Sequence, residues 1–392
     1  MKVLKICGNR FDNENRDRRE LSVYLELGSE IAVLAKGESA DNGRLDTIDG
    51  IPVYRYSTKP LGAHAPKALN KFVSLYLWSR FARKLHPDII SGHDLIPGLT
   101  IAWMSTLFHR NKPKLIYDSH EFELGRNAKR NAFQKFAIRH WERFLMKRCA
   151  FSIMVNDSIA DEVQRIHRLK ERPIVVRSTP NYWELDEAVC AEKREEFLSA
   201  FAATGESVTF LMMYHGGVLG GRGIEHLIEA VSRMDGVGLV IFGNGAAEYK
   251  KALQDLAKGL NAEKKVLFHP AVPIDELWKY VGSVDLEMMP IEAKAKSYYY
   301  ALPNKFFEAI QSEVPIVASD LPEMKRIIEK YQIGLTCKPG NVDDICRCAK
   351  RMREDSAFYK QCKENLKAAK REFCWENEKK VLAAAFETFL EA

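Results

Sequence analysis

Short β-branched or apolar runs alternate with longer helical patterns along almost the whole chain. This alternation is typical of parallel βαβ units, in which each strand is followed by a helix that covers the sheet. In the first part of the chain the runs predict strands near 2–8, 30–35, 52–57, 88–92, 114–118, 150–156 and 173–177. After a charged, weakly patterned stretch over 184–207, they predict further strands near 208–214, 237–242, 265–269, 284–288, 314–318 and 333–336.

The stretch over 184–207 separates two halves with the same α/β pattern. A chain of 392 residues is too long for one compact core. We therefore predict two doubly wound, Rossmann-like domains over 1–183 and 205–375, facing a central cleft. Ligands of open α/β sheets bind outside the carboxyl ends of the strands, so we expect function on strand-to-helix loops. The segment 376–392 has a helical pattern after the second sheet is complete, and this pattern fits packing on either domain.

Composition narrows the class of protein. The chain is 46% hydrophobic and 29% charged, which is ordinary for a globular protein. No run approaches the ~20 uncharged apolar residues of a membrane span, and a strand pattern stands where a signal peptide would, so we expect a cytoplasmic protein. The eight cysteines form no C-x-x-C pair, which argues against a zinc site or a disulfide framework. The net charge of +6 suits phosphate-bearing substrates or an anionic membrane, and no motif indicates nucleic-acid binding.

A glycine-rich loop follows the strand at 208–214 and opens a helical pattern over 223–234. It includes Gly216 and Gly217, and Arg222 is its only cation. Glycines let backbone amides approach a ligand closely, and a helix N-terminus adds partial positive charge that suits phosphate. A guanidinium at this point can bind a diphosphate bidentately. The alternative is a flexible turn with a solvated arginine.

A second loop precedes the helical pattern over 304–312. Pro303 suits the first turn of a helix, so the free amides of the helix N-terminus fall near Asn304 and Lys305. Glu308 lies one turn further on the same face, where its carboxylate can accept from both hydroxyls of a ribose. A ligand with a phosphate at the helix start and a ribose one turn further along would be a nucleotide. Taken alone, Lys305 and Glu308 also fit ordinary solvated surface residues.

The order of these motifs resembles the retaining GT-B glycosyltransferases of family 4. In that family a glycine-rich loop with a cation comes first, as in 216–223, and a strand with a G-x-G turn follows, as at Gly243 and Gly245. The segments 284–290 and 307–319 are similar to the family's strand before the donor loop and to its signature helix and strand. The N-terminal half is similar at 17–20, 92–94 and 117–121, and the likeness continues to 375–376.

The resemblance implies a glycosyltransferase without a cofactor. It would move a sugar, with retention, from a UDP-sugar or GDP-sugar to a glycan or lipid-linked acceptor, in cell-surface polysaccharide or glycoconjugate synthesis. The implied donor-binding residues are Gly216, Gly217, Arg222, Gly243, Asn304, Lys305 and Glu308, and the implied acceptor-side residues are Arg19, His93, Asp94, His120 and Glu121. The implied catalytic residues are His120, Arg222 and Lys305. The resemblance also implies that 376–392 returns to the N-terminal domain.

Two positions depart from the family pattern. The family usually has an E-x7-E pair, but Tyr300 stands eight residues before Glu308. Val218 stands where the family often has a second cation. Lys305 is the residue expected to supply the missing positive charge. These departures suggest one alternative, a non-catalytic nucleotide-sugar-binding subunit. A nucleotide-sugar epimerase of the same fold is another alternative. No metal site is expected, because the one Asp-Asp pair, Asp343 and Asp344, lies at a helix start and suits capping.

His120 follows the strand at 114–118, where a doubly wound sheet places ligand residues. By resemblance it faces the acceptor or the donor sugar, to which a neutral imidazole can donate a hydrogen bond. The alternative is a loop histidine that ties Asp118 and Glu121 to the backbone. His93 and Asp94 occupy the equivalent end of the neighbouring strand, where bracing of the loop is the expected role.

Residues 126–148 carry eight basic side chains and one acid, Glu142. Apolar side chains recur there at helical spacing, at Phe133, Phe136, Ala137, Trp141, Phe144 and Leu145. The pattern predicts an amphipathic basic helix. Such a helix either rests on an anionic membrane, which would make the protein peripheral, or packs its apolar stripe into the core.

Overall fold

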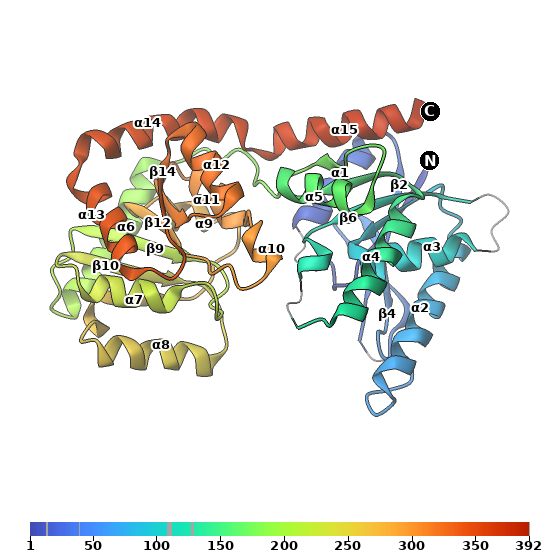
Figure 1. Cartoon of the computed structure of the whole chain (residues 1–392), viewed down its shortest axis with the longest axis horizontal. Helices are drawn as coiled ribbons and strands as arrows, with labels where there is room; N and C mark the ends of the chain where they lie inside the picture. The colour runs from blue at the N-terminus through green and yellow to red at the C-terminus, as the bar shows by residue number, and fades with distance from the viewer. Residues whose placement is uncertain (13–14, 39, 108–111, 127–128, 392) are drawn as a thin grey trace. The chain divides into compact units, whose positions relative to one another are not determined.

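The computed structural model describes residues 1–12, 15–38, 40–107, 112–126 and 129–391. They form two compact units, one of Met1–Arg177 with the segment from Glu378 onward, and one of Ser178–Asn377. Each unit is built on one sheet covered by helices (Figure 1). No helix in the described part of the chain is long and apolar enough to cross a bilayer.

The first unit contains an eight-stranded sheet of order β3-β4-β2-β1-β5-β6-β7-β8. Its strands are β1 (Lys2–Ile6), β2 (Glu30–Lys36), β3 (Asn42–Ile48), β4 (Ile51–Tyr56), β5 (Ile89–His93), β6 (Lys114–Ser119), β7 (Cys149–Met154) and β8 (Ile174–Val175). All neighbours pair in parallel except β3, which runs antiparallel to β4 at the sheet edge. The seven strands predicted in this half are present, and β3 is an addition.

The helices of this unit are α1 (Asn15–Glu26), α2 (Lys67–Lys84), α3 (Thr100–Thr106), α4 (Ala132–Met146), α5 (Asp157–His167) and most of α15 (Trp375–Glu391). Side chains on successive strand residues point to opposite faces of a sheet. On β1, Leu4 accordingly packs in a core with Trp78 of α2, whereas Lys5 reaches Glu20 of α1. The sheet is thus covered on both faces.

The C-terminal part of α15 packs on the first unit. Arg177 donates to the Glu378 carboxylate through its main-chain nitrogen at 2.7 Å and its guanidinium at 3.1 Å. The Phe386 ring lies 4.5 Å from that of Tyr24, centroid to centroid. Residues that follow the second sheet therefore complete the hydrophobic packing of the first unit.

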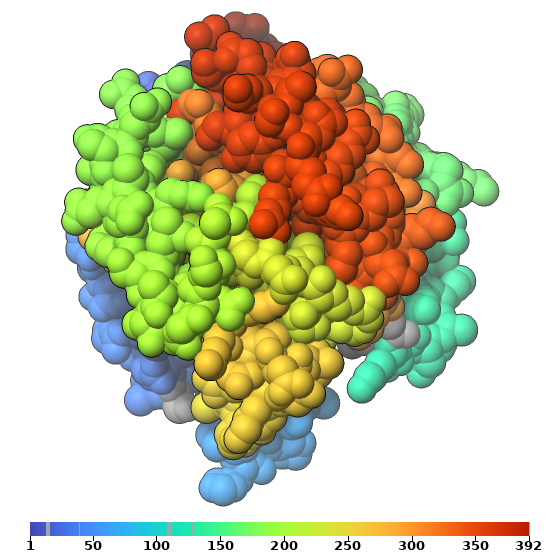
Figure 2. Space-filling model, turned by 90° about the vertical axis from the view of Figure 1, so that its left-hand side faces the viewer, coloured from blue at the N-terminus to red at the C-terminus, as the bar shows by residue number. Residues whose placement is uncertain are grey.

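The second unit contains a six-stranded sheet of order β11-β10-β9-β12-β13-β14, parallel throughout. Its strands are β9 (Phe210–His215), β10 (Val237–Phe242), β11 (Val266–His269), β12 (Leu286–Met289), β13 (Ile316–Ser319) and β14 (Gly334–Cys337). Its helices are α6 (Glu187–Ala203), α7 (Ile224–Ser232), α8 (Ala247–Gly259), α9 (Leu277–Val281), α10 (Lys296–Tyr299), α11 (Asn304–Gln311), α12 (Pro322–Tyr331), α13 (Val342–Glu354) and α14 (Ser356–Glu372). Figure 2 views this unit from the side on which α6 (yellow-green), α8 (gold) and α13 and α14 (red) form the surface.

The weakly patterned stretch over 184–207 is mostly α6. Asp186 caps this helix by accepting from the amides of Ala188 and Val189. Phe197 and Phe201 are buried against β9 and β10. The helix belongs to the second unit, which begins before the predicted domain start at 205.

Candidate active site

Two glycine turns meet at the carboxyl ends of β9 and β10. Gly216 has φ 113° and Gly243 has φ 150°, backbone angles that favour glycine. The Gly216 amide donates to the carbonyl of Phe242 at 2.9 Å. A Cβ on Gly243 would lie 1.9 Å from the carbonyl oxygen of Gly216. Only glycine fits at 243, and its absence of a side chain lets the two turns touch.

Lys305 enters the same region from the first turn of α11. A Cβ on Gly216 would lie 3.9 Å from Cδ of Lys305. The Nζ atom of Lys305 lies 3.5 Å from the centroid of the Tyr214 ring and has no hydrogen-bond partner among the described protein atoms. Burial lowers the pKa of Lys305 to about 7, and Arg222 acts in the same direction. A buried ammonium without a partner is unfavourable, and an anion bound beside it would restore its charge.

The other predicted donor residues flank this lysine. Arg222 is half-buried at the end of the glycine-rich loop, 5.4 Å from the centroid of the Tyr298 ring. Gly217 accepts from the Tyr214 hydroxyl at 2.7 Å through its carbonyl. Asn304 is exposed at the first position of α11, after the N-cap residue Pro303. Free amides of a helix start and two cations thus gather around the glycine turns.

Glu308 is held by a buried histidine. His215 Nε2 lies 2.9 Å from Glu308 Oε2, and His215 Nδ1 lies 3.0 Å from Glu287 Oε1. Burial acts to lower the pKa of His215, but Glu287 and Glu308 outweigh it and raise the pKa to about 9. At neutral pH the imidazolium donates to Glu308 and forms an ion pair with Glu287, which fixes the orientation of Glu308. The sequence pattern did not reveal His215 and Glu287, because they meet across β9 and β12.

A buried charged cluster underlies the predicted acceptor residues in the first unit. Lys5 Nζ lies 3.1 Å from Asp17 Oδ1 and 3.0 Å from Asp118 Oδ2, and it also pairs with Glu20. Burial acts to lower the pKa of Lys5, but the three carboxylates outweigh it and hold the pKa well above its usual value. Burial raises the pKa of Glu20 to about 7. The cluster connects β1, α1 and β6.

Two histidines lie on this cluster. The rings of His93 and His120 are 3.7 Å apart, centroid to centroid. His93 Nδ1 lies 2.8 Å from Asp17 Oδ2, and His120 Nε2 lies 2.9 Å from Asp118 Oδ2. The side chain of His120 is 18% exposed. The contact with Asp118 is a bracing contact of the kind that the loop interpretation expects, and part of the ring stays exposed.

Asp94 and Glu121 share an arginine. Arg126 lies 2.8 Å from Asp94 Oδ2 through Nη1 and 3.1 Å from Glu121 Oε2 through Nε. The Asp94 carboxylate also accepts from the main-chain nitrogen of His120 at 3.1 Å. Asp94 therefore braces the loop after β6, and Arg126 is a further contact that the sequence did not single out.

Arg19 lies half-buried on α1. A different arginine of that helix contacts the histidine, because Arg16 Nε lies 3.2 Å from His120 Nε2 and Arg16 Nη2 lies 3.0 Å from Asp118 Oδ1. Arg16 shares a helix face with Glu20, four residues on. Helical phase is the signal that would have identified it.

In the described residues, two groups of side chains lie close enough to hold a cation. They are Cys7, Asp17 and His93, and Asp17, Asp118 and His120. The Lys5 ammonium already pairs with Asp17 and Asp118, so a metal ion would compete with a buried positive charge. All eight cysteines are free thiols.

Comparison with known proteins gives the family. The family "Glycosyltransferase Family 4" matches residues 23–180, and "Glycosyl transferases group 1" matches residues 206–369. An uncharacterised glycosyltransferase of Methanocaldococcus jannaschii is 26% identical over 361 residues, which are 89% of this chain and 87% of that protein. The chain is a family 4 type glycosyltransferase. The family predicted from the motifs is confirmed.

Solved structures show that this glycosyltransferase has the GT-B fold, as predicted. Sucrose-phosphate synthase of Thermosynechococcus elongatus matches with a TM-score of 0.77 at 14% identity, covering 100% of this chain and 99% of that chain. HepE of Anabaena, solved in complex with UDP, matches with a TM-score of 0.75 at 14% identity, covering 100% of both chains.

The two departures from the family pattern differ in their surroundings. Val218 is fully buried in the core, and its amide donates to the carbonyl of Asn244 at 2.9 Å. Its side chain thus faces the core, while the side chain of Lys305 comes from α11 and passes Gly216. Tyr300 is half-buried, with its ring 5.3 Å from that of Tyr299.

Proposed function

We propose that this glycosyltransferase transfers a sugar from a nucleotide-diphosphate sugar, with a UDP-sugar favoured over a GDP-sugar, and that the C-terminal unit holds the donor. The observation that carries the proposal is the buried Lys305 ammonium, which has no hydrogen-bond partner among the described atoms and ends a side chain that passes Gly216. A diphosphate supplies the missing anion. The preference for uridine is supported by the Anabaena protein, which was solved with UDP and with UDP-glucose.

Each donor residue has a role in this proposal. Arg222 and Lys305 neutralise the diphosphate, and the amides of Gly217 and Asn304 add hydrogen-bond donors. Gly216 and Gly243, whose amides donate to the carbonyls of Phe242 and His269, let the backbone approach the ligand closely. Glu308, oriented by His215, accepts from the ribose hydroxyls. Negative charge grows on the diphosphate as the glycosidic bond breaks, so the two cations stabilise the transition state more than the bound donor.

We propose transfer with retention and without a metal ion. The departing phosphate oxygen draws the proton from the acceptor hydroxyl on the face that the phosphate leaves, so the sugar keeps its anomeric configuration. Arg222 and Lys305 supply the positive charge that the diphosphate needs. His120, braced by Asp118, donates a hydrogen bond to a sugar hydroxyl and thereby positions the reacting ring.

The proposed acceptor is a glycan or a lipid-linked glycan, bound through the N-terminal unit near Arg19, His93, Asp94, His120 and Glu121. A cavity of about 320 Å³ lies between α2 and the loop after β5. Three lysines line it, together with the apolar side chains of Leu75, Ile96 and Pro97. Cations beside an aliphatic wall suit a phosphate that joins a glycan to a lipid, which supports the lipid-linked choice.

Lys305→Met tests the donor proposal, because it is expected to move two measurements in opposite directions. Replacing a buried charge with an apolar side chain of similar length stabilises the free protein, by about 1–4 kcal/mol. The same change removes the partner of the diphosphate, so stabilisation by the donor, about 2.7 kcal/mol at a hundredfold excess over Kd, is lost. Thermal unfolding with UDP-, GDP- and ADP-sugars measures both effects. Lys258→Met, at an exposed lysine of α8, is the matched control.

Other outcomes would redirect the proposal. A full donor-induced shift in Lys305→Met would remove the assigned role of this lysine. Isomerisation of the donor sugar in the absence of any acceptor would instead favour an epimerase. Donor binding without transfer to any of a broad set of acceptors would favour a binding subunit.

A further inference from the structure

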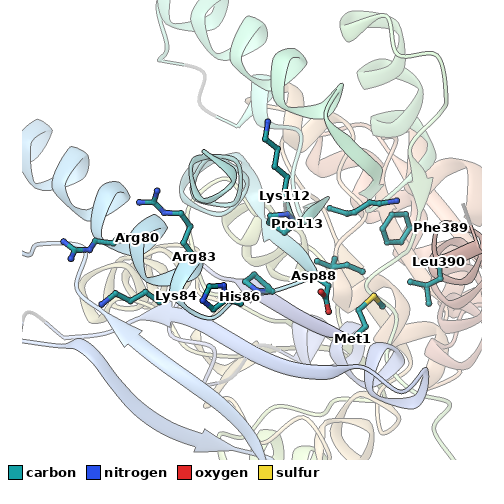
Figure 3. A pocket seen from close by; sticks show the side chains of 13 residues that line it. Met1, Arg80, Arg83, Lys84, His86, Asp88, Lys112, Pro113, Phe389 and Leu390 are labelled. Atoms are coloured by element: carbon teal, nitrogen blue, oxygen red, sulfur yellow. The ribbon is translucent and has the colours of Figure 1, made fainter. Parts of the chain in front are cut away.

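A second cavity, of about 1010 Å³, lies in the N-terminal unit at the amino ends of its strands (Figure 3). It is formed by the end of α2, the starts of β5 and β6 and the end of α15. His93 and Asp118 lie at the opposite ends of the same two strands. The cavity is therefore at the other edge of the sheet from the proposed acceptor residues.

The cavity wall is strongly basic. Its basic side chains are Arg80, Arg83, Lys84, His86, Lys112 and Lys114. Asp88 is the only acid among the described lining residues, and its carboxylate accepts from the main-chain nitrogen of Lys2 at 2.7 Å. In the described part of the chain, Arg80, Lys84, Lys112 and Lys114 form no ion pair with a carboxylate. Unpaired cations around a concave surface produce a positive potential that attracts anions.

The opposite end of the cavity is apolar. Phe389 and Leu390 of α15 line it, and Figure 3 shows them at the far end from Arg80, Arg83 and Lys84. Leu390 is 43% exposed. Lys114 Nζ lies 4.9 Å from the centroid of the Phe389 ring, so one of the unpaired cations is close to the apolar end. One end of the cavity is thus cationic, and the other combines apolar side chains with the Lys114 cation.

We propose that this cavity binds a phosphate monoester or diphosphate carried on an apolar body. The phosphate contacts Arg80, Arg83 and Lys84, since guanidinium and ammonium groups are the side chains that bind phosphate best. The apolar body packs against Phe389 and Leu390. The volume is that of a small-molecule site. A phospholipid headgroup with its acyl chains and a nucleotide with its base share this chemistry.

The test is calorimetric titration of the full chain with three probes. They are inorganic pyrophosphate, AMP and a short-chain phosphatidic acid kept below its critical micelle concentration. Arg80→Glu with Lys84→Glu reverses two exposed charges and is expected to weaken binding of all three probes at this cavity by about tenfold or more. The control, Lys258→Glu with Lys360→Glu, makes the same charge change at exposed positions of the other unit and leaves affinities unchanged.

Leu390→Ser tests the apolar end separately. It is expected to weaken binding of the apolar-bodied probes several-fold and to leave pyrophosphate binding unchanged. Tighter binding of phosphatidic acid than of AMP identifies a lipid as the source, and the reverse order identifies a nucleotide. Equal affinity of the wild type and the Arg80→Glu, Lys84→Glu variant for every probe would overturn the proposal, as would a preference for pyrophosphate over both other probes.

This test is independent of the donor proposal. Pyrophosphate and AMP also suit the proposed Lys305 site, so the measured quantity is the difference between the wild type and the cavity variant. The variant leaves Arg222 and Lys305 unchanged. Unfolding temperatures without ligand show whether each variant is folded, and the exposure of Arg80, Lys84 and Leu390 predicts that they are.

Discussion

Lys305 combines burial, a positive charge and the absence of a described hydrogen-bond partner. Buried charges are normally paired, because the loss of hydration is otherwise uncompensated. The Tyr214 ring, 3.5 Å from Nζ, offers only its π face. A buried, unpaired charge of this kind is expected at a site where a bound ligand supplies the missing partner. The stability of the free protein and the affinity for the donor are therefore opposed at this position.

The pKa of Lys305 predicts that donor binding weakens as pH rises. With a pKa of about 7 in the free protein, the side chain is charged below that pH and loses its proton above it. The bound diphosphate requires the ammonium, so the Kd for UDP-glucose is expected to rise by up to about tenfold per pH unit above 7. Calorimetry between about pH 6 and 8.5 measures this, below the pKa of about 9 at which His215 would release Glu308.

Lys305→Arg is the control for this profile. A guanidinium stays protonated throughout the range, so the variant is expected to bind with little dependence on pH. A wild-type Kd that is constant from about pH 6 to 8.5 would contradict the proposal that Lys305, with its lowered pKa in the free protein, binds the diphosphate.

At the residue scale, sequence predicts the residues that local patterns mark. The glycines at 216 and 243 and the cation at a helix start could be predicted from local sequence patterns. The residues that orient the site could not. His215 and Glu287 come from neighbouring strands, and Arg16 reaches His120 from a helix far away in the sequence. Contacts of this kind depend on tertiary packing, which no spacing rule contains.

At the element scale, α4 divides its apolar stripe between two environments. Leu145 is fully buried, and Trp141 packs edge-to-face on Trp103 at 5.1 Å. Phe133 and Phe136 in the first turns are 76% and 60% exposed. The core-packing interpretation of the sequence pattern thus holds for one half of the helix. Contact of the exposed half with an anionic membrane stays a prediction.

Phe133→Ser with Phe136→Ser is expected to reduce membrane binding. Each exposed phenylalanine that inserts contributes about 1.5–3 kcal/mol, so the double variant should lose at least about tenfold in affinity. Co-sedimentation with vesicles rich in anionic phospholipid, at low salt, measures the bound fraction. Leu25→Ser with Val381→Ser changes exposed residues of α1 and α15 and serves as the control. Equal sedimentation of all three proteins would rule out insertion through α4.

The elements that sequence did not reveal lack a continuous apolar pattern. β3 lies at the sheet edge, pairs on one side only and is rich in polar residues, so no alternation marks it. In α6 the buried side chains Cys190, Phe197 and Phe201 are spaced widely along a helix that is otherwise mostly charged or small. Strands in the middle of each sheet were predictable because burial on both faces requires a continuous apolar run.

At the scale of the whole molecule, the first unit is discontinuous in sequence. Glu378 is tied to Arg177, and Phe386 and Phe389 pack against Tyr24 and Phe151. The second unit is one continuous segment, from Ser178 to Asn377. Helical periodicity predicts that α15 exists, but its pattern fits either sheet, so the choice of unit came from the family resemblance.

Phe386→Ala is expected to destabilise the first unit selectively. Loss of a fully buried phenylalanine costs about 3–5 kcal/mol, because a cavity remains beside Tyr24. Hydrogen exchange should therefore accelerate in β1, β5 and α1 and stay unchanged in β9 and β10. Thr388→Ala, whose hydroxyl donates only to the Ala384 carbonyl within the same helix, is the matched control. Uniform acceleration in both units would mean that they unfold together.

The discontinuity also sets an order of events on the ribosome. Domains usually fold as they emerge, the upstream one first. Here the downstream domain has all its residues once translation has passed Asn377, whereas the upstream one still lacks the partners of Tyr24 and Phe151. A polypeptide released after Asn377 is expected to expose the apolar rings of its N-terminal portion to chaperones while its later portion is native.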